Sequence, residues 1–126
     1  MSLNREKYQA FVTLLEQLRS DATSTQILTP ELRQGVASLQ QFFRQQIVPL
    51  ADVGDEASLQ GEAWRVQSYQ TEMSKQLRLL EIDVMFLQGA RQASTAQTRL
   101  QAISDRLTTL IQYCDAILQA EAEGEK

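Results

Sequence analysis

Glu81 and Asp83 stand inside the most apolar stretch of the chain, where a pair of carboxylates could act as general acid and general base. Residues two positions apart on a helix point to different sides, so these two carboxylates would not serve one site. The chain contains no histidine, which removes the commonest general base and the commonest metal ligand. No glycine-rich phosphate loop or known catalytic signature accompanies the two acids. The sequence therefore predicts no catalytic residue.

Cys114, the single cysteine, is the second candidate for chemistry. It follows Leu107 and Leu110 at helical spacing, which predicts a small residue in a packed core. A reactive thiolate needs a cation nearby, and the next residue is Asp115. One cysteine also excludes an internal disulfide and a cysteine-cluster zinc site. We expect neither a metal nor a cofactor.

Basic residues along the second half of the chain are a candidate for binding. The chain as a whole is acidic, with a net charge of −4 and a pI near 4.8, which argues against nucleic-acid binding and adsorption to anionic membranes. A locally basic face could attract an acidic segment of a protein partner. The alternative is a solvated face whose side-chain stems cover apolar surface. The predicted partner-binding residues are Lys75, Arg78, Arg91 and Arg99.

These candidates must be positioned by helices, because apolar residues recur every three or four positions. The spacing predicts four helices, over about 3–20, 29–48, 62–89 and 94–120. Pro49 disfavours helix at Val48, so the second helix should end or kink there. The most regular seam lies in the last helix and consists of Ala96, Leu100, Ile103, Leu107, Leu110, Cys114 and Ile117.

The third helix carries two apolar lines, and such a broad apolar face predicts contacts with more than one neighbour. Its first line runs from Val66 to Leu87, and the second comprises Leu79, Ile82, Phe86 and Ala90. We predict an all-α fold: an up-down bundle of four helices in which the last two form a long antiparallel hairpin. Because the first two helices are shorter, part of this hairpin should remain uncovered and available to a partner.

Domain organisation and location follow from the same patterns. Residues 1–120 should form a single bundle domain, 121–126 an acidic disordered tail, and 52–61 the longest loop. The start of the chain lacks an apolar signal core, and the longest apolar run falls far short of the roughly 20 residues of a membrane span. We expect a cytoplasmic protein without membrane insertion.

Residues 74–92 (SKQLRLLEIDVMFLQGARQ) continue into a second distinctive stretch at 106–114 (RLTTLIQYC). Together with residues 40–43 and 47–50, they resemble the heterocyst frequency control protein family, PatD, which comprises small helical proteins of filamentous cyanobacteria. The similarity spans most of residues 1–118 and is densest from 69 to 118. It implies a role in limiting how many vegetative cells become nitrogen-fixing heterocysts, and a link to cell division through the tubulin-like protein FtsZ. The resemblance assigns no site residues, because the family has no motif with an established chemical role.

We therefore expect a non-enzymatic regulatory protein that controls heterocyst frequency and differentiation through protein–protein contact. Two alternatives stay open. One is a generic helical adaptor or self-associating scaffold, in which the seam serves homo-oligomerisation. The other is a helical ligand carrier or enzyme, which would require a large polar-lined cavity.

Overall fold

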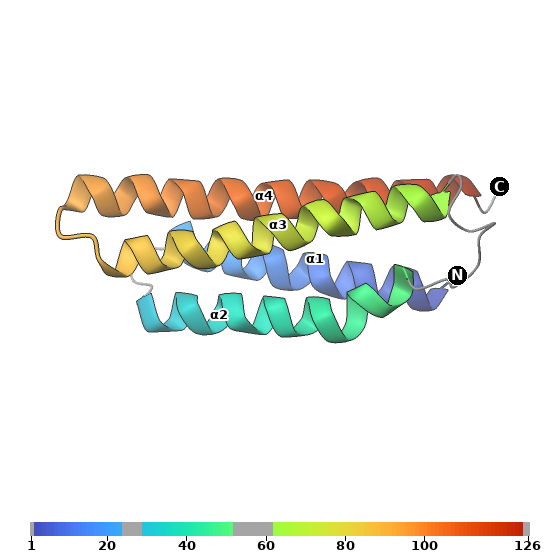
Figure 1. The fold of residues 1–126 in the computed structure, drawn as a ribbon, viewed down its shortest axis with the longest axis horizontal. Helices are drawn as coiled ribbons and strands as arrows, with labels where there is room; N and C mark the ends of the chain where they lie inside the picture. Colours follow the sequence, from blue (N-terminus) through green and yellow to red (C-terminus); the bar gives the residue numbers. More distant parts are fainter. Residues whose placement is uncertain (1, 24–28, 52–61, 125–126) are drawn as a thin grey trace.

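Four α-helices alternate in direction along one long axis in the described part of the chain, which comprises residues 2–23, 29–51 and 62–124 of a computed structural model (Figure 1). The helices are α1 (Ser2–Thr23), α2 (Thr29–Phe42), α3 (Glu62–Gln88) and α4 (Ala93–Gly124). α3 and α4 form the long antiparallel hairpin, joined by a short turn. The predicted fold class, an up-down bundle of four helices, is confirmed.

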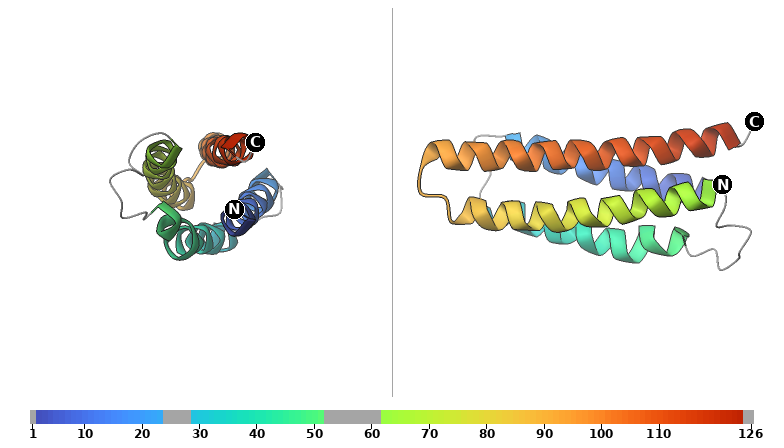
Figure 2. Two further views of the ribbon diagram at one scale, coloured as in Figure 1. Left: turned by 90° about the vertical axis from the view of Figure 1, so that its right-hand side faces the viewer. Right: turned by 45° about the horizontal axis from the view of Figure 1, so that its top comes forward.

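The helices surround one core that runs along the bundle axis. Seen end-on, they stand at the corners of a closed arrangement, in which each helix contacts the next and α1 also contacts α4 (Figure 2). α1 contributes buried aromatic residues such as Tyr8 and Phe11, and α3 contributes Met73 and Leu80. This arrangement gives α3 two helical neighbours, α2 and α4.

The seam predicted for α4 forms the centre of this core. Side chains from Ile103 to Ile117 along the seam are buried, and Leu107 is 0% exposed. Ala96 and Leu100 are only half-buried. The first turns of α4 extend past the end of α1, so these two positions lack the cover that the rest of the seam receives (Figure 1).

The second helix changes its winding before Pro49. α2 passes into a π-helical turn, η1 (Phe43–Ile47), and then into a 3₁₀ turn, η2 (Val48–Ala51), and the ribbon bends toward α3 (Figure 1). The Val48 amide donates to the Phe43 carbonyl, which is the bonding pattern of a π-turn. Pro49 has no amide hydrogen with which to continue the α-helical pattern. The predicted end or kink near Val48 is therefore confirmed.

A buried glutamine ties this irregular segment to the bundle. The Gln70 amide on α3 donates to the Ile47 carbonyl at 2.9 Å and to the Tyr8 hydroxyl at 2.8 Å. The Ile47 carbonyl lies where the π-turn meets the 3₁₀ turn, so a side chain supplies a partner where regular helical bonding stops. Gln70 thereby connects α3 to both α1 and η1.

Two helix ends differ from the sequence prediction. α1 continues to Thr23, past the expected end at residue 20, and Ala22 within this extension is buried. α4 continues to Gly124, four residues into the segment 121–126 that the sequence predicts to be a disordered tail. Alanine and glutamate favour helix there. The predicted loop at 52–61 and residues 125–126 lie outside the described residues.

Candidate interaction surface

The two candidate acids face different neighbours. The side chain of Asp83 is 4% exposed and turned toward α4, where its Oδ1 lies 3.4 Å from Nη1 of Arg99 and its Oδ2 accepts a hydrogen bond from Nε of Arg106. Glu81 is exposed and lines a hollow between α2 and α3. The prediction that the two carboxylates lie on different sides is confirmed, and they do not form an acid–base pair.

The Asp83 cluster joins the two long helices. Arg106 also donates through Nη1 to Oε1 of Gln76 at 3.4 Å, and the Arg99 guanidinium carbon lies 4.4 Å from the ring centroid of Phe86. Both arginines come from α4, while Asp83, Gln76 and Phe86 come from α3. The chemistry of this cluster is charge pairing between helices, which holds the hairpin in register.

The four predicted partner-binding residues are spread over the hairpin. Lys75 is exposed, and its Nζ lies 3.4 Å from Oε1 of Glu72 on the same helix. Arg78 is exposed and lines a hollow between α3 and the end of α2. Arg91 is exposed in the turn between α3 and α4 rather than on either helix. Arg99 is bound to Asp83 and stacked on Phe86, so its charge is partly neutralised within the bundle.

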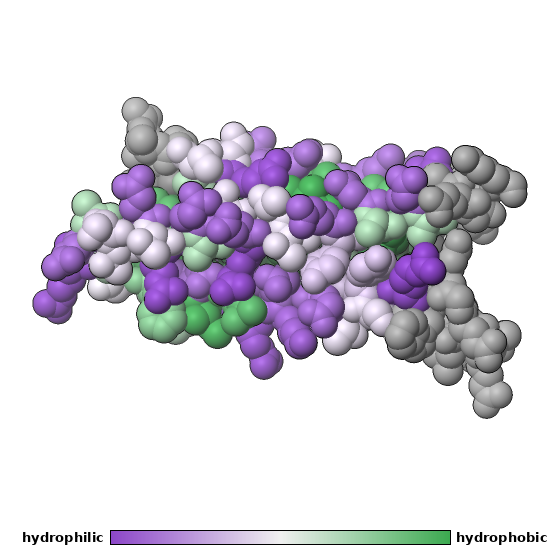
Figure 3. All heavy atoms as spheres, turned by 90° about the horizontal axis from the view of Figure 1, so that it is seen from above, coloured by the Kyte–Doolittle hydropathy of each residue, from purple (hydrophilic) through white to green (hydrophobic). Residues whose placement is uncertain are grey.

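The second apolar line of α3 faces outward. Leu79 and Ile82 are each 37% exposed, Phe86 is 53% exposed, and the neighbouring Met85 is 63% exposed. The prediction that α3 contacts more than one neighbour is confirmed, because α2 and α4 both pack against it, while this second line lies largely outside the core. Hydrophobic atoms accordingly gather along the α3 edge near the α3–α4 turn (Figure 3). We call these four residues, Leu79, Ile82, Met85 and Phe86, the α3 patch.

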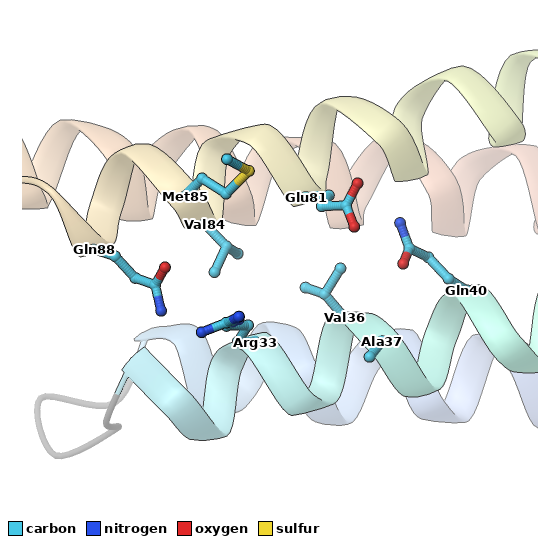
Figure 4. Close-up of a pocket in the computed structure, with 8 residues that line it drawn as sticks. All are labelled: Arg33, Val36, Ala37, Gln40, Glu81, Val84, Met85 and Gln88. Atoms are coloured by element: carbon cyan, nitrogen blue, oxygen red, sulfur yellow. The ribbon is translucent and has the colours of Figure 1, made fainter.

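A groove lies beside the α3 patch, along the line where α3 packs against α2. One part is a hollow of about 300 Å³, in which Val36 and Val84 point toward each other between the helices, and Arg33 and Gln88 lie at one end (Figure 4). Its other lining residues are Ala37, Gln40, Glu81 and Met85. Met85 belongs to the α3 patch as well, so the patch and the hollow form a continuous surface.

The groove continues toward η1 as a second hollow of about 310 Å³. It shares Gln40 and Glu81 with the first hollow, and the Gln40 amide reaches the Leu77 carbonyl at 3.5 Å. The remaining lining residues are Phe43, Arg44, Val48, Ser74, Leu77 and Arg78. We call the two hollows together the α2–α3 groove.

Two arginines of this groove, Arg33 and Arg44, are absent from the predicted binding set. They belong to a stripe of residues spaced four, three and four apart, a pattern that places them on one side of a helix. This stripe consists of Arg33, Ala37, Gln40 and Arg44. The spacing was available in the sequence, but only the position of α3 shows that this side borders a groove.

Cys114 lies in the core, as its seam position predicts, with its Sγ 3.9 Å from Sδ of Met73. Burial raises the pKa of the thiol from 9.0 to about 12, and the negative charge of Asp115 adds to the rise. The thiol is therefore neutral throughout the physiological range.

We expect Cys114 of the folded protein to resist a thiol-specific reagent at pH 8. Only the thiolate reacts, and burial keeps the thiol protonated and out of reach of the reagent. Labelling in denaturant should be complete and rapid. Rapid labelling of the native protein at pH 8 would contradict the buried placement.

The buried thiol also makes stability depend on pH. Since the folded pKa lies above the unfolded one, the folded state holds its proton more tightly, and the free energy of unfolding should fall as the pH rises from 9 toward 12.

The described part of the chain offers neither a metal-binding cluster nor a helix suited to crossing a membrane. Within residues 2–23, 29–51 and 62–124, no group of three or more histidine, cysteine, aspartate or glutamate residues could hold a metal ion. No helix among the described residues combines the length and apolar character needed to cross a membrane.

Comparisons with known proteins do not extend this picture. No protein-family model, curated protein or solved structure matches the chain. Function must therefore be inferred from the residues and their arrangement.

Proposed function

We propose that this chain is a non-enzymatic regulatory protein that acts by binding another protein through the α3 patch and the adjoining α2–α3 groove. The observation that carries the proposal is the exposure of four large apolar side chains on one helix whose core positions are already filled. Contiguous apolar surface of this kind marks interaction sites in folded proteins.

The resemblance to the PatD family gives this proposal its biological setting. The α3 patch falls within residues 69–118, where that resemblance is densest. We propose that the chain controls heterocyst frequency in filamentous cyanobacteria from the cytoplasm, through a differentiation or division protein such as FtsZ. Self-association through the same patch is the rival function, and the experiment below separates the two.

The central residue of the α3 patch provides the test. We expect Ile82→Asp to abolish partner capture and to fail to restore heterocyst spacing in a deletion strain, because a carboxylate would have to be desolvated at the contact. Helicity and melting temperature should change little, since Ile82 is partly exposed. The measurements are capture of FtsZ and other division proteins, heterocyst counts and circular dichroism.

Leu14→Asp is the matched control, because Leu14 is a similarly exposed apolar residue on α1. It should capture the partner and restore heterocyst spacing like the unmodified protein. Full activity of Ile82→Asp would contradict the proposal. Sedimentation that shows a dimer lost in Ile82→Asp, without any partner captured by the unmodified protein, would favour self-association instead.

A further inference from the structure

We infer that the α2–α3 groove receives an acidic amphipathic helix of the partner protein. This inference rests on the proposed function and names the chemistry of the partner that the surface would take. The three observations behind it are the apolar floor of the groove, the sign of its rim charges, and the spacing of those charges.

The floor of the groove is mainly apolar in the first hollow and mixed in the second, where polar side chains share the lining with apolar ones. Val36 and Val84 underlie the first hollow, and Phe43 and Leu77 underlie the second; all four side chains are buried. The exposed Met85 and Val48 add apolar surface at its sides. A segment that occupies the groove would therefore turn apolar residues toward its floor and polar residues toward its rim, as an amphipathic helix does.

The rim of the groove is basic although the chain as a whole is acidic. Arg33, Arg44 and Arg78 line the two hollows and are exposed. Glu81, which both hollows share, is the one acidic residue among the described residues of the two linings. Complementary charge on the partner would therefore be negative. A second copy of this chain that offered the same groove would bring like charges together.

The positions of the charges add detail to this pattern. Arg33 lines the first hollow, Arg44 and Arg78 line the second from opposite helices, and Glu81 lies where the hollows meet. Arg33 and Arg44 are eleven residues apart, which corresponds to roughly 16 Å along a helix. A bound helix would match them with acidic residues separated by about three turns. Between these acids, uncharged or basic residues would face Glu81.

Defined peptides test this inference directly. The first is a helical peptide of about 20 residues with leucines at every third or fourth position, glutamates on both flanks near its ends, and a lysine midway. The second replaces each glutamate with lysine and the lysine with glutamate, and the third scrambles the first. In fluorescence anisotropy at low salt, the first peptide should bind at least about tenfold more tightly than the others. Added salt should weaken its binding.

Charge reversal then locates the site. In the triple variant Arg33→Glu, Arg44→Glu and Arg78→Glu, the affinity for the acidic peptide should fall by more than about tenfold. This variant should bind the lysine peptide instead. Arg65→Glu is the control for a single charge reversal outside the groove, because Arg65 is exposed on α3 but lies outside both linings. It should leave both affinities unchanged. Ala37→Trp should block the acidic peptide without a change of charge, since Ala37 is exposed in the groove lining.

Two outcomes would overturn the groove assignment: equal binding of the acidic and lysine peptides by the unmodified protein, or unchanged acidic-peptide binding by the triple and Ala37→Trp variants. The proposed function would survive either result if Ile82→Asp still abolished partner capture. Conversely, an active Ile82→Asp variant would contradict the proposed function whatever the peptides do. Circular dichroism of each variant shows that the bundle is intact when binding is measured.

Discussion

Leu107→Ala should lower the free energy of unfolding by about 2–5 kcal/mol, the range observed when a fully buried leucine is truncated. Leu107 is 0% exposed and lies at the middle of the α4 seam, where α1 and α3 pack against α4. The lost side-chain atoms leave a cavity that helices fixed on both sides cannot fully close. Urea unfolding followed by circular dichroism measures the change. An equal dependence of the free energy on urea concentration in the variant and the unmodified protein would show that only stability has changed.

Leu79→Ala is the control for this prediction, because it makes the same substitution on the exposed α3 patch. Leu79 keeps 37% of its surface accessible, so its truncation removes little buried area and should cost less than about 1 kcal/mol. Equal losses in the two variants would mean that the α4 seam is no better packed than the patch. A loss below about half a kcal/mol for Leu107→Ala would place that residue at a soft interface.

The contrast between Leu107 and Leu79 also shows how far the sequence alone determines this fold. Spacing by three and four identifies which residues share a stripe on a helix, and the α4 seam is buried as predicted from Ile103 to Ile117. Spacing does not say which of two apolar lines on one helix will face the core. The broad apolar face of α3 correctly predicts more than one neighbour, but α2 and α4 pack against the first apolar line and leave the second one exposed.

The candidate site was less predictable than the fold because it depends on how helices are rotated against one another. Arg78 was identified from its charge, and the structure places it on a groove. The same reasoning predicts Arg99, but Arg99 faces the buried Asp83 across the hairpin. Pairs of this kind join residues far apart in the sequence, so no local pattern reveals them. Arg33 and Arg44 are candidates because α3 lies beside α2 and forms a groove with it, and no local sequence pattern shows that neighbour.

The Asp83 cluster gives the second large effect. We expect Arg106→Met to lower the free energy of unfolding by about 2–3 kcal/mol, because it removes the partner of a nearly buried carboxylate. Arg99 would remain at 3.4 Å as the other partner of Asp83. The side chain of Arg106 is itself 29% exposed, which keeps the expected loss below that of a completely buried ion pair. Arg78→Met, on the exposed rim of the groove, should leave stability nearly unchanged.

A double-mutant cycle separates this electrostatic loss from lost packing. Asp83→Leu combined with Arg106→Met replaces the pair with apolar side chains, and such replacements are often neutral or stabilising. The double variant should therefore recover at least about 1 kcal/mol relative to the sum of the single changes. Arg99 can turn toward water in that variant, since 37% of its side chain is already exposed. Strictly additive losses would show that the stabilising contribution of Asp83 does not depend on Arg106.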